Sequence, residues 1–161
     1  MCGVIGSTSA QTPSESSQDS NNVAAGVFNI AGQLTGLAPG NYRALHVWKP
    51  TAPGSAVHHS HIQIQDPNGV DLFHFGLFDN QGTAAVIGGP GAAPSSSGYN
   101  ISTSYAPNPS TVTNVQLLAA YNQAIGVCGG TYQLFHNNCQ KFARHFMTTL
   151  GVKHYRRLFH P

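Results

Sequence analysis

Cys139 is the residue whose setting in this sequence best suits covalent chemistry. The stretch from Tyr132 to Gly151, YQLFHNNCQKFARHFMTTLG, predicts a short strand, a corner at Asn137-Asn138 and a helix that begins at Cys139. A cysteine in the first turn of a helix lies at the positive end of the helix dipole, among N–H groups that have no intrahelical partner. Both effects favour the thiolate, which is the nucleophile. The sequence therefore predicts a cysteine-dependent enzyme that works through a thioester.

A thiolate of this kind needs a base, and histidine is the usual one. The chain has nine histidines, of which His58, His59, His61 and His74 fall on an expected hairpin. Alternation along the strand 59–65 puts His59, His61 and Gln63 on one face and the isoleucines on the other. We expect the isoleucines to pack against helices and the histidine face to look into a cleft beside Cys139. Residue types alone leave both His59 and His61 open as the base.

His74 is the predicted third member of the site, where it would orient the base, although a histidine in a polar strand rim is an equal interpretation. His58, His59, His61, His74 and Cys139 are residue types that can bind zinc, but their spacings match no common structural zinc pattern. The sequence also lacks His-Glu-x-x-His. We therefore predict no metal and no cofactor. Two plainer interpretations of Cys139 are a buried small hydrophobe and a disulfide to Cys128.

The elements that must position these residues predict an α+β fold. Alternating strands are expected over 42–48, 59–65, 71–78 and 84–87, with a turn at 66–69. A helix should follow the capping-box pair Thr113 and Gln116 and end at the glycines 126–130. The final helix carries an apolar stripe at Phe142, Phe146 and Leu150. We expect a small antiparallel sheet packed on two or three helices.

The composition of the chain limits its domain organisation, its partners and its cellular compartment. Residues 7–22 are polar and low in complexity, which predicts a disordered N-terminal arm over 1–25, followed by a single domain over 26–161 with a flexible loop at 88–110. Charged residues make up 7% of the chain and the net charge is +2, so no nucleic-acid partner is expected. Three irregularly spaced cysteines predict reduced thiols and a cytoplasmic, soluble protein. No segment resembles a transmembrane span or a signal peptide.

These residues resemble the conserved boxes of a known enzyme family. The box around Cys139, with Tyr132, Leu134, Asn138 and Phe142, resembles the second box of the permuted papain-like (NlpC-type) cysteine enzymes. One branch is the PPPDE family of desumoylating and deubiquitinating isopeptidases, and the other is the lecithin:retinol acyltransferase family. The segment HIQIQDPNG at 61–69 is similar to their histidine box. The two boxes cover about a third of the chain, in the His-before-Cys order of the permuted arrangement.

The resemblance implies a permuted papain-like cysteine-hydrolase fold, with Cys139 as nucleophile and His61 as base in a His–Cys dyad. His59 is an alternate base, and His74 lies near the second histidine of the acyltransferase branch, which would make a His–His–Cys triad. The Cys139 N–H, with Gln63 and Asn138, is expected to position the substrate or its oxyanion. Gln140 departs from the Asn or Glu of the two branches.

Three functions follow as hypotheses. The first is a peptidase, isopeptidase or amidase acting on a protein or peptide substrate, which includes a ubiquitin-like tail. The second is a lipid-directed thiol acyltransferase or phospholipase, against which the missing hydrophobic C-terminal anchor argues. The third is a non-catalytic binding module on the same fold.

Overall fold

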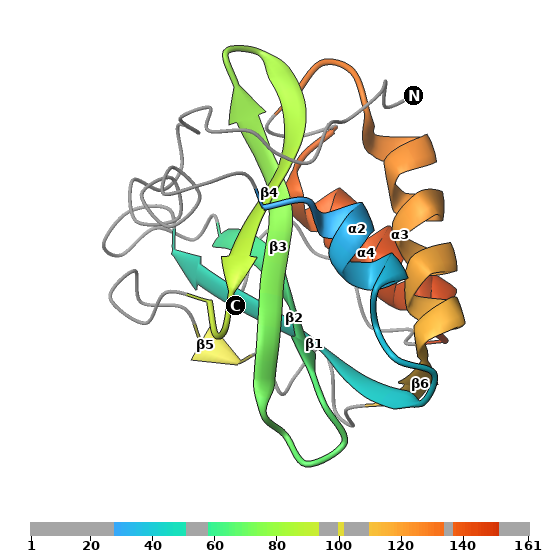
Figure 1. Cartoon of the computed structure of the whole chain (residues 1–161). Coiled ribbons are helices and arrows are strands. Elements are labelled where there is room, and N and C mark those ends of the chain that lie inside the picture. Colours follow the sequence, from blue (N-terminus) through green and yellow to red (C-terminus); the bar gives the residue numbers. More distant parts are fainter. Residues whose placement is uncertain (1–27, 51–57, 94–99, 102–109, 134–136, 152–161) are drawn as a thin grey trace.

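The computed structural model describes residues 28–50, 58–93, 100–101, 110–133 and 137–151. In this part of the chain an antiparallel sheet packs on three helices, so the α+β class is confirmed (Figure 1). The expected arm at 1–25 lies outside the described residues, as does most of the expected loop 88–110.

The sheet is built from β1 to β6 and is antiparallel at every pairing. The order across the sheet is β4-β3-β2-β1, and β5 and β6 both pair with the outer edge of β1. The strand bounds are β1 Asn41–Pro50, β2 His58–Gln65, β3 Asp71–Asn80, β4 Thr83–Pro90, β5 Asn100–Ile101 and β6 Ser110–Thr113. The four longest strands match the predicted ones within a few residues at each end.

The turn between β2 and β3 has the chemistry that its sequence predicts. The Asp66 carboxylate accepts hydrogen bonds from the N–H groups of Asn68 and Val70, at 2.8 and 2.9 Å. Gly69 has φ +85, a value that suits a residue without a Cβ. This turn fixes the register in which Gln63 pairs with His74.

The three helices are α2 Ile30–Thr35, α3 Asn114–Cys128 and α4 Cys139–Thr149. The predicted capping box of α3 is confirmed: the Thr113 side chain accepts from the Gln116 N–H, and the Gln116 side chain accepts from the Thr113 N–H. None of the helices in the described part of the chain is long and apolar enough to cross a membrane.

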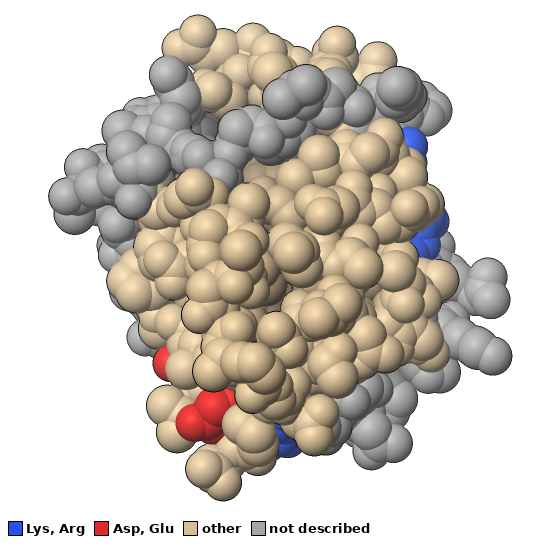
Figure 2. Space-filling model, turned by 45° about the vertical axis from the view of Figure 1, so that its right-hand side comes forward, with Lys and Arg blue, Asp and Glu red and all other residues tan. Residues whose placement is uncertain are grey.

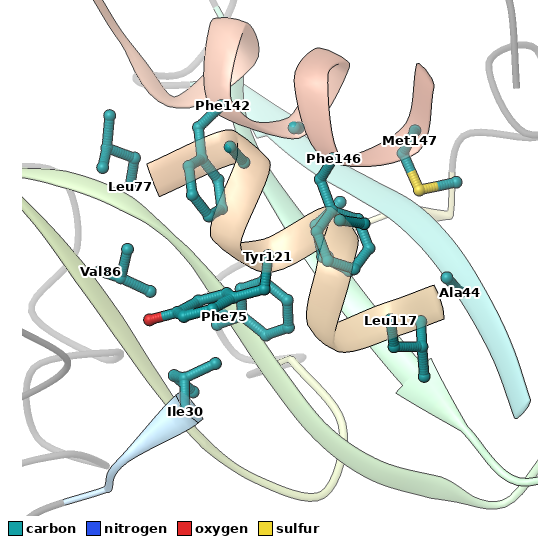
Figure 3. Close-up of a cluster of buried hydrophobic side chains, with 14 of the residues drawn as sticks. Ile30, Ala44, Phe75, Leu77, Val86, Leu117, Tyr121, Phe142, Phe146 and Met147 are labelled. Carbon is teal, nitrogen blue, oxygen red and sulfur yellow. The ribbon is translucent and has the colours of Figure 1, made fainter. Parts of the chain in front are cut away.

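The main core lies between one face of the sheet and the three helices (Figure 3). Phe75 on β3 makes edge-to-face ring contacts with Tyr121, Phe142 and Phe146, which come from α3 and α4. Ile62 and Ile64 are fully buried in the same cluster, as predicted from the strand pattern. This packing fixes the angle at which α4 meets β2.

One boundary expectation was wrong. The flexible loop was expected to start at Gly88, but β4 continues to Pro90, and Gly88 pairs with Phe75 of β3. A Cβ at Gly88 would collide with the carbonyl oxygen of His74 and lie 2.8 Å from Cδ1 of Ile30. Glycine at this position therefore permits close packing between a helix and two strands rather than loop freedom.

Candidate functional site

The site begins at the N-terminus of α4, where Cys139 is the first helical residue, as predicted. The Asn138 side chain caps the helix by accepting a hydrogen bond from the Lys141 N–H at 2.8 Å. The Cys139 sulfur is buried and accepts a hydrogen bond from the backbone N–H of Ser60 at 3.4 Å. A thiolate in this position is stabilised by the helix dipole and by a directed N–H donor.

The backbone N–H of Cys139 already has a partner in this structure. It donates to the hydroxyl oxygen of Tyr132 at 3.3 Å. The predicted use of this N–H for an oxyanion therefore requires that it leave the Tyr132 hydroxyl when substrate binds.

Asn137 fastens the corner that precedes the helix. Its side-chain amide donates to the carbonyl oxygens of Cys128 and Thr131, at 3.2 and 2.8 Å. Its backbone exchanges two hydrogen bonds with Gln133. The end of α3 and the start of α4 are thus tied together, which holds the thiol in place. Neither Cys128 nor Cys139 forms a disulfide.

Three fully buried histidines lie on the face of the sheet that points away from the helices. The rings of His59 and His61 lie 4.4 and 5.1 Å from that of Phe78, which belongs to a small separate apolar cluster with Ile87. This face was expected to look into a cleft beside the helix that begins at Cys139, but it lies on the side of the sheet opposite the core that packs against α4. Because Ile62 faces the helices, alternation turns its neighbour His61 to the other side.

The seam between β2 and β3 nevertheless brings the His61 ring and the Cys139 thiol toward the same two residues, Ser60 and Gly76. The register of these strands covers Ile62 to Gln65, so Ser60 lies beyond its end. The Ser60 carbonyl oxygen lies 2.9 Å from the position of a Cβ at Gly76 on β3. In an extended strand the N–H of a residue points to the same side as its carbonyl. The Cys139 sulfur, which accepts a hydrogen bond from the Ser60 N–H, therefore lies at this seam.

His61 meets the same seam from the opposite face. Its Cδ2 and Nε2 atoms lie 2.5 and 3.0 Å from the position of a Cβ at Gly76. Any side chain at Gly76 would displace the imidazole or the Ser60 carbonyl. Glycine at position 76 therefore lets the His61 ring lie against β3, next to Ser60.

His61 and His74 form a hydrogen-bonded pair. Their Nδ1 atoms are 3.1 Å apart and their rings stack, with centroids 5.2 Å apart. One Nδ1 must donate and the other accept. The structure thus brings these two predicted site residues together, with the Nε2 edge of His61 toward Gly76.

Gln63 is engaged in holding a neighbouring segment. Its amide nitrogen donates to the carbonyl oxygens of Phe73 and Gly91, both at 3.0 Å, and its amide oxygen accepts from the Ala93 N–H at 2.8 Å. Both N–H donors of the amide are used, so the predicted oxyanion role of Gln63 has no donor in this structure. Its side chain thus attaches Gly91 and Ala93 to β2.

His46 is the polar residue that sequence reasoning missed. It lies on β1 opposite Ile62, which places it on the helix-facing side of the sheet, and it is buried. Its Nε2 lies 2.8 Å from the hydroxyl oxygen of Ser60. The available signal was the alternation of Tyr42, Ala44 and His46, which puts this histidine on the face of the core.

Two basic side chains lie on α4. Lys141 and Arg144 follow Cys139 on the helix, and its first turn has no acidic residue. The pKa of His145 is lowered by partial burial, and further by Arg144 and Lys141. In the described ranges, no cluster of three or more His, Cys, Asp or Glu side chains could hold a metal ion. His58 lies on β2, at its first position.

Comparison of the chain with protein-family models, with curated proteins and with solved structures found no match.

Proposed function

We propose that this protein is a cysteine-dependent hydrolase in which Cys139 forms a thioester with the acyl part of its substrate. The observation that carries the proposal is the Cys139 sulfur at the start of α4, in hydrogen-bond contact with the Ser60 N–H. Ser60 lies between His59 and His61 in the sequence, so the backbone that contacts the thiol also carries both candidate bases.

His61 is the proposed base, and the bond to His74 supports it. If His61 donates its Nδ1–H to Nδ1 of His74, the proton-accepting position of His61 is Nε2, the atom near Gly76. His74 then orients the ring, as the third member of a triad does. His59 is the alternate base, because it flanks Ser60 on the other side.

The reaction proceeds in two balanced halves. His61 takes the proton of Cys139, the thiolate attacks the substrate carbonyl, and the departing amine or alcohol leaves with the proton returned by His61. Water then gives a proton to His61 and attacks the thioester. The acid is released, and the sulfur recovers its proton. A protein or peptide amide is the proposed first substrate class.

A second candidate is a lipid-directed acyltransferase or phospholipase of the lecithin:retinol acyltransferase type. The His61–His74 pair favours it, since a second histidine belongs to that branch of the resemblance and the isopeptidase branch usually has an aromatic residue there. On this reading the thioester passes its acyl group to an acceptor other than water. A permuted papain-like fold is part of both proposals.

Acylation by p-nitrophenyl acetate, followed by intact-mass and peptide mass spectrometry, tests the proposal. We expect one acetyl group on Cys139, lost in Cys139→Ser, slowed in His61→Gln and unchanged in the control Cys128→Ser, which alters a buried thiol at the end of α3. A panel of fluorogenic peptide and isopeptide amides, set against phosphatidylcholine vesicles, then separates the two substrate classes. Failure of Cys139 to acylate faster than a simple thiol would leave the binding-module hypothesis.

A further inference from the structure

His46 and Ser60 form a buried polar pair on the helix-facing side of the sheet, next to the seam between β2 and β3 at which the Cys139 sulfur lies. The Ser60 hydroxyl contacts His46 Nε2 at 2.8 Å, and the Ser60 backbone N–H contacts the Cys139 sulfur at 3.4 Å. One residue therefore carries two contacts, one to a histidine and one to the thiol. All three residues are at most 4% exposed to solvent.

Ser60 is paired with one neighbouring strand of the sheet. Ser60 pairs with Trp48 of β1, but the register of β2 with β3 begins only at Ile62. On its β3 side the strand is therefore not held by a ladder at this residue. The bond from His46, which lies on the same strand β1, adds a second constraint from that side. A hydrogen bond to sulfur is useful only if its donor is held in direction.

We propose that His46 is a positioning residue that holds Ser60 so that the Ser60 N–H stays directed at the Cys139 sulfur. This inference rests on the proposed function, because it concerns the same thiol. It adds a histidine on the opposite face of the sheet from the proposed base His61. His46 acts on the reaction through Ser60 and does not exchange a proton with the substrate.

The chemical consequence concerns the charged form of the thiol. A hydrogen bond to an ionised group is stronger than one to a neutral group. If the Ser60 N–H is no longer held toward the sulfur, the thiolate therefore loses more stabilisation than the thiol does. The reactivity of Cys139 should then need a higher pH, whereas damage confined to the fold would lower the unfolding temperature and leave the pH profile unchanged.

The test measures the rate of Cys139 alkylation by iodoacetamide against pH, resolved by peptide mass spectrometry, in the full chain. The variants are His46→Leu, which cannot bond the hydroxyl, His46→Gln, which can, and Ser60→Ala, which keeps the backbone N–H. The matched control is Tyr42→Phe, because Tyr42 lies on the same strand and face and donates its hydroxyl to the distant Ala38 carbonyl at 2.6 Å. Thermal unfolding of each variant shows that it is folded.

We expect the midpoint of the profile to rise by about one pH unit in His46→Leu and in Ser60→Ala. The double variant should rise no further than either single one, because the two residues share one interaction. His46→Gln and Tyr42→Phe should keep the wild-type midpoint. Equal loss of reactivity in His46→Gln and His46→Leu would overturn the positioning role, because it would require the imidazole itself.

The outcome also distinguishes this inference from the function on which it rests. A wild-type midpoint at the value of an ordinary thiol would contradict the proposed function. A low wild-type midpoint that neither His46→Leu nor Ser60→Ala moves would overturn the inference alone. If His46→Leu fails to fold, Ser60→Ala and His46→Gln decide the question, since both are small changes in volume.

Discussion

Gly76 takes no part in the proposed chemistry, but the placement of His61 and Ser60 depends on its lack of a side chain. The Gly76→Ala change places a Cβ 2.5 Å from His61 Cδ2 and 2.9 Å from the Ser60 carbonyl oxygen. We expect a loss of about 1–3 kcal/mol in the free energy of unfolding, with slower acylation of Cys139. Denaturant unfolding and the p-nitrophenyl acetate assay measure the two effects.

The control for that change is Gly126→Ala in α3, where a Cβ meets nothing within 4 Å. Replacing a helical glycine with alanine should stabilise the protein by about 0.5–1 kcal/mol and leave acylation unchanged. Wild-type stability and activity in Gly76→Ala would contradict the close approach of His61 to β3.

The protonation of His145 predicts how the stability of the protein changes with pH. Its pKa in the folded protein is lowered by partial burial, Arg144 and Lys141, so the unfolded chain binds its proton more readily. Stability should therefore fall as the pH drops through the ordinary histidine pKa, where the unfolded state takes up that proton. The His145→Gln variant should lose less stability than wild type between pH 7.5 and about pH 5.5. An identical decline in both proteins, measured by urea unfolding, would refute this contribution.

The sequence predicted a helix that begins at Cys139 and a contact between His74 and the candidate base His61, and the structure has both, but the choice of base stays open. Alternation predicts which residues share a face of β2, and this was confirmed, because His59, His61 and Gln63 lie together and Ile62 and Ile64 face the core. Alternation does not tell which face meets the thiol. That depends on where α4 crosses the sheet, which is a long-range packing result. His46 was missed for the same reason.

Among the helices and strands, α4 carries the proposed nucleophile. Changes to its N-cap, Asn138, distinguish effects on stability from effects on thiol reactivity. Asn138→Ala removes the acceptor of the Lys141 N–H, and we expect about 1 kcal/mol of lost stability with a higher pKa of the Cys139 thiol. Asn138→Asp keeps the cap, so stability should be retained, but its carboxylate should also raise the thiol pKa.

Thr113→Ala is the matched control for these variants, since it removes the equivalent cap of α3. It should cost a similar free energy of unfolding, about 1 kcal/mol, without any change in the alkylation profile. If Thr113→Ala shifted the profile as much as Asn138→Ala, the effect would belong to global stability and not to the helix N-terminus.

The long elements were predictable because their patterns are strong. Strands β1 to β4 alternate or carry β-branched and aromatic residues, and α3 and α4 have caps and apolar stripes. The helix α2 was not predicted, because the six residues of Ile30–Thr35 are too short for a helical period to stand out. Strands β5 and β6 have only two and four residues, and they form because β1 offers an open edge.

At the scale of the fold, the described residues form one main apolar core, and only 7% of the chain is charged. The face in Figure 2 is almost entirely uncharged, with a few basic and acidic side chains near its margins. Phe146 is fully buried against Phe75 in the main core, and Phe146→Ala should cost about 3–5 kcal/mol in unfolding free energy.

Val115→Ala supplies the comparison for that core variant, because Val115 is 70% exposed. Its effect should stay within about 0.5 kcal/mol of wild type. Chemical denaturation of the two variants measures both values. Equal costs for the two changes would contradict the placement of the core between the sheet and α4.

The central claim is that Cys139 is an activated nucleophile, and its alkylation by iodoacetamide against pH tests that claim most directly. Peptide mass spectrometry assigns the reaction to Cys139, and Cys139→Ser provides the blank. The account predicts a midpoint clearly below the ~8.5 of an ordinary thiol, which rises when His61 is replaced by glutamine. A midpoint at or above that value, unmoved by His61→Gln and by His59→Gln, would contradict the enzyme proposal and leave Cys139 as a buried structural residue.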